Sequence, residues 1–281
     1  MTAPLLEIRD LRVDYMGEGG PVPALHGVDL TIAPGETLGI VGESGCGKST
    51  LISAILRLMA ANARVSGGSI RFDGRDMLAL PAREMRLMRG KDISIVFQDP
   101  MQTHNPVIPI GRQLIDIQFR EPLSRREKYA RAVAMLEQVE LSEPERHMRQ
   151  YPFELSGGMR QRLAIAMAML CRPRLLIADE PTTALDATLE IQILDKLRDL
   201  QRDTGCAVIF ISHHLGAVAR LCERVMVMYR GHVVEEGRLA PIFAAPAHAY
   251  TRALMECDPA ALPERRRILP SITDEMRRSF L

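Results

Sequence analysis

The chain has 281 residues, enough for one large domain or two small ones, and 47% of them are hydrophobic against 25% charged. This is the composition of a globular protein. The 36 basic and 35 acidic residues nearly balance, so the net charge does not indicate a nucleic-acid groove, although it leaves room for a local basic patch. The cysteines form no C-x-x-C pair, which argues against a disulfide framework or a zinc site and fits a reducing cytosol. They are Cys46, Cys171, Cys206, Cys222 and Cys257.

Two observations bear on membranes. No run reaches the roughly 18 apolar residues that a membrane-spanning helix needs, so none is expected. Residues 1–10 contain acids and lack an apolar core, so they do not fit a signal peptide. If the protein acts at a membrane, it has to dock on proteins already there.

In chain order, the first elements predict an α/β fold. Residues 5–13 and 22–32 alternate apolar and polar side chains, as antiparallel or edge strands do. Residues 37–41 form a short apolar run that ends in a glycine-rich turn, and residues 49–59 follow with a helical pattern. Strand, glycine loop and helix in this order are typical of the start of a nucleotide-binding α/β fold.

The later elements extend this fold. Residues 99–173 are mostly helical in pattern and predict a helical insertion, with Pro106, Pro109, Pro122 and Pro144 as breaks. Residues 175–178 and 207–211 read as buried parallel strands. Residues 187–201 predict an amphipathic helix. From about Pro241 the chain is richer in Pro, Ala and Arg and is taken as an extension.

The turn after residue 41 matches the pattern G-x-x-x-x-G-K-[ST] and is called the phosphate loop below. Its glycines let successive N–H groups point at phosphate oxygens, Lys48 can reach the β- and γ-phosphates, and the Ser49 hydroxyl can ligate Mg²⁺. A glycine turn with a solvent-exposed lysine is the alternative, which the flanking strand and helix disfavour. The predicted ATP contacts are Gly42, Glu43, Ser44, Gly45, Cys46, Gly47, Lys48, Ser49 and Thr50.

An acidic pair follows the apolar run at 175–178. Neighbouring side chains on a strand point to different sides, so Asp179 and Glu180 can take different roles. Asp179 can hold Mg²⁺, and Glu180 can act as the general base that polarises the attacking water. Alone, two acids at a strand end are more often solvated or capping the next helix, but the phosphate loop upstream favours the catalytic interpretation.

Residues 155–162, Leu-Ser-Gly-Gly-Met-Arg-Gln-Arg, resemble the signature motif of the ABC ATPases. Ser-Gly-Gly before a helical run is by itself only a helix cap. In order with the phosphate loop and the acidic pair, it identifies the chain as a member of that family. The resemblance implies that Ser156, Gly157, Gly158 and Gln161 contact ATP held by a second chain.

Four further residues match motifs of the same family. Gln98 matches the glutamine that joins Mg²⁺ and the attacking water to the helical subdomain, and Asp186 ends the D-loop segment that starts at Ala184. His213 matches the switch histidine that senses the γ-phosphate, although His214 replaces the acid common at the next position. Tyr15 stands where the family stacks an aromatic ring on adenine; an aromatic residue in an early strand is otherwise usually part of the core.

The resemblance implies a P-loop NTPase core with a parallel sheet, an N-terminal antiparallel β subdomain and an inserted helical subdomain. We expect an ATP-binding domain at 1–240, with the helical subdomain at about 99–173, and a C-terminal extension at 241–281.

Three segments resemble the group that imports peptides or nickel. They are Asp99-Pro100-Met101 with Asn105-Pro106, the run from Ala178 to Asp186, and the run from His248 to Leu254. Ala249 stands where the group has proline, and residues 102–104, Gln-Thr-His, depart from its usual sequence. Members with an iron–sulfur cluster have several cysteines near the C-terminus; only Cys257 lies there, so no cluster is expected.

The implied function is the MgATP-hydrolysing subunit of an ABC importer at the cytoplasmic face of the bacterial inner membrane. Its implied partners are a second, different ATPase chain, two permease subunits and an extracytoplasmic solute-binding protein, with no nucleic acid. The alternatives are a DNA-repair or chromosome-organising ATPase and a non-catalytic regulatory subunit. The first needs coiled coils, zinc sites or tandem domains, and the second would lack Glu180 or His213.

The extension at 241–281 has two interpretations. Its prolines and excess arginines fit a loosely ordered end. Alternatively, residues 248–254 pack on the core, because Tyr250 and Leu254 stand at i,i+4 and form one small apolar face. All nucleotide motifs lie before residue 214, so we expect the extension to be dispensable for ATP chemistry but not for transport.

Overall fold

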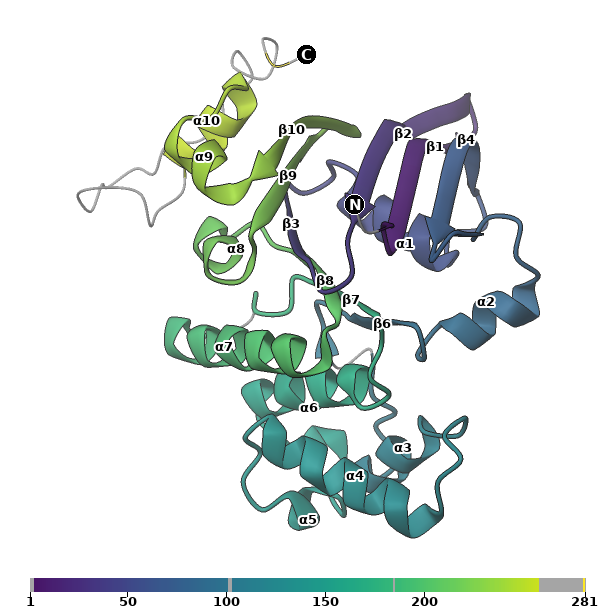
Figure 1. The fold of residues 1–281 in the computed structure, drawn as a ribbon, viewed down its shortest axis with the longest axis vertical. Helices are drawn as coiled ribbons and strands as arrows, with labels where there is room; N and C mark the ends of the chain where they lie inside the picture. Colours follow the sequence, from purple (N-terminus) through teal and green to yellow (C-terminus); the bar gives the residue numbers. More distant parts are fainter. Residues whose placement is uncertain (1–2, 101–102, 184, 258–279, 281) are drawn as a thin grey trace. The chain divides into compact units, whose positions relative to one another are not determined.

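The computed structural model describes residues 3–100, 103–183, 185–257 and 280 (Figure 1). Met101, Gln102 and Ala184, each part of a segment discussed above, and residues 258–279 of the extension lie outside the described residues. The chain divides into two compact units: the first comprises residues 1–81 and 210–281, and the second comprises residues 82–209. Within the part described, no helix is both long and apolar enough to cross a membrane.

The first unit begins with an antiparallel sheet, as the alternating pattern predicts. In spatial order the strands are β2 (Gly20–Ile32), β1 (Leu6–Gly17), β4 (Ala63–Phe72) and β5 (Arg75–Asp76). The strands β1 and β2 pair from Leu6 opposite Ile32 to Gly17 opposite Gly20, and β4 pairs along the other edge of β1 (Figure 1). Apolar side chains such as Ile8 are fully buried on one face.

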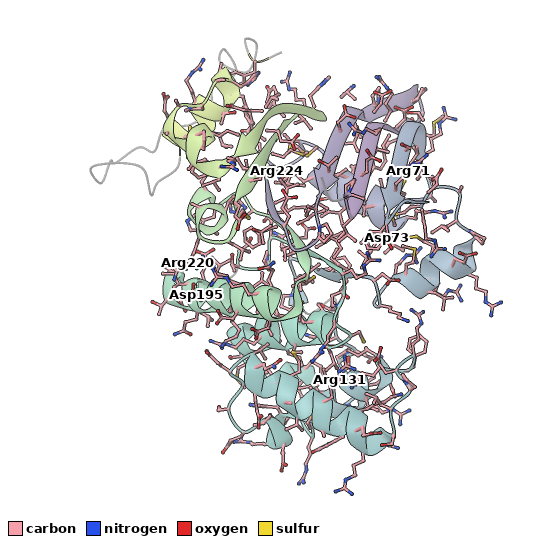
Figure 2. The ribbon with its side chains drawn as sticks, in the orientation of Figure 1. Arg71, Asp73, Arg131, Asp195, Arg220 and Arg224 are labelled. Atoms are coloured by element: carbon pink, nitrogen blue, oxygen red, sulfur yellow. The ribbon has the colours of Figure 1, made fainter. Side chains whose placement is uncertain are left out.

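A second group of strands in this unit leads to the phosphate loop. The strand β3 (Thr37–Val41) is buried along its whole length and runs parallel to β9 (Arg224–Tyr229), with β10 (His232–Arg238) antiparallel on the far side of β9. Arg224, labelled in Figure 2, makes ion pairs with Glu36 at 3.2 Å and Glu236 at 3.5 Å. The helices of this unit are α1 (Lys48–Leu56), α8 (Leu215–Leu221), α9 (Leu239–Ala244) and α10 (Ala249–Glu256).

The helix after the phosphate loop is shorter than the sequence predicts. It ends at Leu56 because Arg57 takes the left-handed conformation (φ 49°) and closes the last turn through its N–H. The Arg57 guanidinium then binds the carbonyl oxygens of Met77 and Leu80 at 3.0 and 2.5 Å. These contacts with a distant loop override the apolar pattern that continues to residue 59.

The second unit contains the parallel pair β6 (Ile93–Val96) and β7 (Leu175–Asp179), and the second of these confirms the strand predicted at 175–178. The strand β8 (Ala207–Ile211) confirms the one predicted at 207–211 and includes the boundary between the units. The helices are α2 (Ala82–Met88), α3 (Ile110–Asp116), α4 (Arg125–Gln138), α5 (Pro144–His147), α6 (Gly157–Met169) and α7 (Ala187–Thr204).

The helices between residues 110 and 169 pack on one another. The helix α4 contacts α3, α5 and α6, and α6 in turn contacts α7 (Figure 1). Arg131 of α4, labelled in Figure 2, pairs with Glu121 at 3.1 Å.

Pro109 precedes α3 and Pro144 occupies the first turn of α5, so these two prolines start helices, where a missing N–H costs nothing.

Candidate nucleotide-binding site

The phosphate loop lies between a buried strand and a helix. β3 delivers the chain to Gly42, and α1 begins at Lys48 directly after Gly47, whose φ is 110°. At Gly42 (φ +153°) an added Cβ would lie 2.2 Å from the carbonyl oxygen of Met228 on β9. Backbone atoms cannot move aside cheaply, so the loop can follow this path against β9 only with glycine here.

We therefore expect Gly42→Ala to lower the free energy of unfolding by about 2–4 kcal/mol, through steric overlap and a strained φ. Urea unfolding of both variants measures the loss. Gly157→Ala is the matched control, because no atom lies within 4 Å of the added Cβ and the φ is ordinary. Comparable losses in the two variants would contradict this account of the loop.

The side chain of Lys48 bends back toward the start of the phosphate loop. It is 7% exposed, and its Nζ donates to the carbonyl oxygens of Gly42 at 2.6 Å and Glu43 at 3.0 Å. Its ammonium therefore lies inside the ring of backbone where the sequence predicts the β- and γ-phosphates. Ser49, on the first turn of α1, is exposed.

Two neighbouring side chains complete the loop region. Cys46 is 4% exposed, and burial raises the pKa of its thiol, so the sulfur stays protonated at neutral pH and is a packing group. Tyr15 on β1 is half-buried, and its hydroxyl lies 3.3 Å from the Oγ1 of Thr50. Tyr15 is thus beside the loop; its stacking on adenine stays a prediction.

In the second unit the acidic pair closes β7. Asp179 is its last residue, and Glu180 follows with a left-handed backbone (φ 45°), which is uncommon outside glycine. The Glu180 carboxylate oxygen Oε2 accepts hydrogen bonds from Gln98 Nε2 at 3.1 Å and from Thr183 Oγ1 at 3.1 Å. Two predicted residues 82 positions apart in the chain, Gln98 and Glu180, are therefore in direct contact.

The signature segment, residues 155–162, forms the start of α6. Ser156 is the N-cap, and its hydroxyl accepts from the N–H of Met159 at 3.4 Å. At Gly158 an added Cβ would lie 2.3 Å from a methyl group of Leu189 on α7, so glycine allows these two helices to approach closely. Gln161 is only 2% exposed, which places it inside the unit and not at its surface.

The two remaining predicted residues follow β7 and β8. Asp186 caps α7, and its side chain accepts from the N–H of Leu189 at 2.9 Å. His213 is exposed two residues after the end of β8, between the buried Ser212 and the half-buried His214. The N–H of His214 donates to the Ser212 hydroxyl at 2.9 Å, which fixes the backbone around His213.

The predicted residues thus fall into one group in each unit. The first unit contains the phosphate loop with Tyr15 and His213, and the second contains the acidic pair with Gln98, the signature segment and Asp186. Sequence reasoning missed Thr183, the second hydrogen-bond donor to Glu180. Its only signal was the position three residues after an acid, where a hydroxyl can turn back to the preceding chain.

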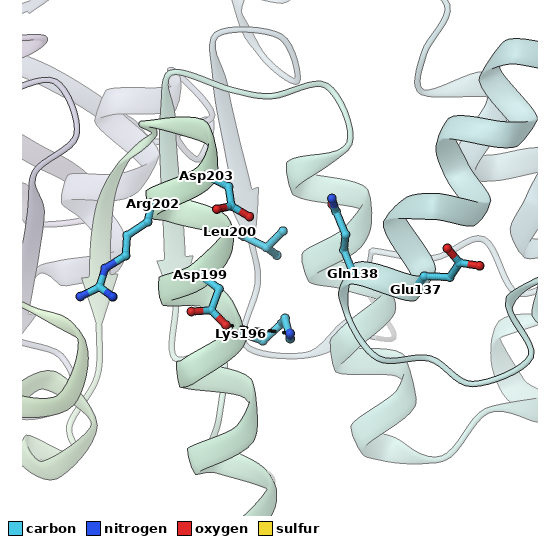
Figure 3. A pocket seen from close by; sticks show the side chains of 7 residues that line it. All are labelled: Glu137, Gln138, Lys196, Asp199, Leu200, Arg202 and Asp203. Atoms are coloured by element: carbon cyan, nitrogen blue, oxygen red, sulfur yellow. Dashed lines mark ion pairs between the residues drawn. The ribbon is translucent and has the colours of Figure 1, made fainter.

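A separate pocket lies on the second unit, lined by residues of α4 and α7 (Figure 3). Three of its lining residues are acids, namely Glu137, Asp199 and Asp203, which is unfavourable for a phosphate group. Lys196 in this pocket is paired with Glu140 at 3.0 Å and lies 3.9 Å from Asp199. The acids that line this pocket outnumber its two cations, Lys196 and Arg202, so the phosphate loop remains the candidate for the nucleotide.

Comparison with known proteins agrees with this geometry. Residues 25–183 match the family described as ABC transporter. The chain is 47% identical over 256 residues to the oligopeptide transport ATP-binding protein OppD of Salmonella typhimurium, covering 91% of this chain and 76% of that protein. It is 46% identical over 257 residues to the OppD of Bacillus subtilis, and this match covers 91% of this chain and 72% of that protein.

A solved structure shares the fold as well. This is a dimeric ATP-binding cassette in a post-hydrolysis state with bound ADP and Pi, which is 30% identical in sequence. The TM-score is 0.74, and the match covers 83% of this chain and 98% of that one.

Proposed function

The chain belongs to the ABC transporter family of ATPases, and on this premise we propose that it is the ATP-hydrolysing subunit of a peptide importer. The observation that carries the proposal is the 47% identity to an oligopeptide transport ATP-binding protein over 91% of this chain. Nickel or a metal chelate is the alternative solute. A role in DNA repair or chromosome organisation is not favoured by these relatives.

In this proposal the predicted residues take successive roles in one catalytic cycle. Lys48 and the N–H groups of the phosphate loop bind the phosphates of ATP, and Tyr15 stacks on the adenine. Glu180, oriented by Gln98 and Thr183, accepts a proton from the attacking water. His213 senses the γ-phosphate.

The oxygen donors of Ser49 and Asp179, together with the amide oxygen of Gln98, fit the preference of Mg²⁺ for hard ligands. In this proposal they hold the ion, which when bound offsets the charge of the β- and γ-phosphates. P-loop proteins present such ligands at two positions, and this chain has a suitable residue at each. Asp179 lies at the carboxyl end of a buried parallel strand, and Ser49 lies on the first helical turn after the loop.

We propose further that two ATPase chains act head to tail. Ser156, Gly157, Gly158 and Asp186 of one chain then face ATP on the phosphate loop of the other. The γ-phosphate joins the two chains, and hydrolysis releases them, which makes a ligand-controlled two-state switch. The second ATPase is a different, related chain, and both lie at the cytoplasmic face of the membrane on two permease subunits.

Reconstitution tests the solute and the assembly together. The chain is co-expressed with the permeases, the second ATPase and the binding protein of its operon, and ATP hydrolysis is measured in proteoliposomes. We expect binding protein loaded with oligopeptide to raise ATP turnover at least about threefold over the unloaded binding protein. The reason is that binding of the correct substrate drives the conformational closure that assembles the catalytic site. Stimulation by nickel or a chelate, without any by peptides, would contradict the proposed solute.

The same purified complex reveals its subunit composition by mass spectrometry. We expect this chain and one different ATPase in equal amounts. A complex that contains only this ATPase would refute the pairing of unlike chains and leave a homodimer.

A further inference from the structure

The helix α10 of the C-terminal extension lies in the first unit, the unit that contains the phosphate loop (Figure 1). Its Tyr250 is fully buried, and the ring packs against Tyr229 at 4.4 Å and against Phe280 at 5.4 Å between centroids. With aromatic rings on two sides, the Tyr250 ring has little freedom to move. The position of its hydroxyl is therefore set by packing.

That hydroxyl contacts the phosphate loop. The backbone N–H of Glu43, the second residue of the loop, donates to the Tyr250 oxygen at 2.8 Å. This N–H and the carbonyl of Gly42 belong to one peptide group, and the carbonyl accepts from Lys48 Nζ at 2.6 Å. One peptide plane is thus held on both edges, by Lys48 and by Tyr250.

Tyr250 reaches the loop because β10 anchors the start of its helix. The Glu235 carboxylate on β10 accepts from the N–H groups of Ala247 at 2.9 Å and His248 at 3.1 Å, the two residues just before α10. A carboxylate at a helix N-terminus is favoured by the free N–H groups and the helix dipole. Burial raises the pKa of the Tyr250 hydroxyl, so it is neutral and adds no negative charge beside the phosphates.

We propose that Tyr250 is a positioning residue for ATP, which holds the Gly42–Glu43 peptide so that Lys48 and the loop are ready to bind the phosphates. The proposal rests on ATP binding by the phosphate loop and assigns the C-terminal extension to that site. It argues against the sequence-based expectation that residues 241–281 are dispensable for ATP chemistry. A chain truncated after residue 239 lacks all of α10, including Tyr250.

The test is Tyr250→Phe in the 281-residue chain. The ring and its packing remain, but the oxygen that accepts from the Glu43 N–H is removed. The Gly42–Glu43 peptide thereby loses one of the contacts that hold it, so ATP has to restore the binding geometry. We expect the Kd and KM for ATP to rise about fivefold to tenfold, with kcat changed less than about twofold.

Phe280→Leu is the matched control, because leucine still packs on the Tyr250 ring, the Tyr229 ring stays on the other side, and the hydroxyl keeps its place. This variant is expected to lower Tm at least as much as Tyr250→Phe while the Kd for ATP stays at the parent value. Faster hydrogen exchange at the Glu43 amide in Tyr250→Phe alone is the second readout. Unchanged ATP affinity in Tyr250→Phe, or an equal loss in Phe280→Leu, would overturn the proposal. Absence of ATP binding by the parent protein would instead count against the site itself.

Discussion

Lys48→Ala is expected to weaken ATP binding about 100-fold and to reduce ATP turnover to background, which corresponds to about 2.7 kcal/mol in binding. The lysine is buried and donates to the carbonyl oxygens of Gly42 and Glu43, so it orders the loop as well as supplying positive charge. Alanine removes both contributions at once. Isothermal titration with ATP and a phosphate-release assay measure the two effects separately.

The matched control is Lys196→Ala. Lys196 pairs with Glu140 on the second unit and is not among the proposed ATP contacts, so its loss is expected to leave ATP affinity within about twofold, the effect of an ordinary surface substitution. Both variants remove one of the four lysines, Lys48, Lys91, Lys128 and Lys196, and hence one positive charge, so comparing them separates a non-specific charge effect from the specific loss of Lys48. Equal ATPase rates for Lys48→Ala and the parent protein would remove the phosphate loop from the site.

Local patterns predicted the framework of this site well. The strand–loop–helix unit around Gly42 and the strand before Asp179 both follow from short apolar runs beside glycines or acids, and β3 and β7 confirm them. β9 was not predicted, although it is the parallel neighbour of β3. Its run Val225–Met228 is buried throughout, and a short, continuously apolar segment has no period that separates strand from helix.

Contacts between distant residues could not be predicted from spacing. Gln98 was assigned a role beside the attacking water only through the resemblance to ABC ATPases, whereas Glu180 was assigned from its place at a strand end, and their hydrogen bond depends on the parallel pairing of β6 with β7. The i,i+4 pattern of Tyr250 and Leu254 indicated a packing face on α10, and Tyr250 is indeed buried. The acceptor role of its hydroxyl toward Glu43, 207 residues away, has no sequence signal.

Glu180 combines two features that suit a general base. Its backbone is held in the left-handed region, which the surrounding structure has to stabilise, and strained positions of this kind cluster at functional sites. Gln98 and Thr183 both donate to the same carboxylate oxygen and so fix the plane of the carboxylate. A base held in one orientation can accept the proton of the attacking water without further rearrangement.

Glu180→Gln is expected to reduce ATP turnover about 1000-fold while the Kd for ATP changes little, because the amide keeps the shape but cannot accept the proton. The amide oxygen can take the same two hydrogen bonds from Gln98 and Thr183, so the local structure survives. With Asp179 in place, the proposed Mg²⁺ ligands are also retained. ATP therefore remains bound unhydrolysed, and the assembled ATPase pair is expected to persist in size-exclusion chromatography with MgATP.

Glu190→Gln is the control for this variant. It makes the same chemical change on the first turn of α7, where Glu190 accepts a hydrogen bond from Thr182 at 2.7 Å, and it leaves the proposed base in place. Turnover in this control is expected to stay near the parent rate, and the pair should dissociate after hydrolysis. Normal turnover in Glu180→Gln would show that another group accepts the proton. Lost ATP binding would instead show that Glu180 acts in the ground state, through the charge that it places beside the nucleotide.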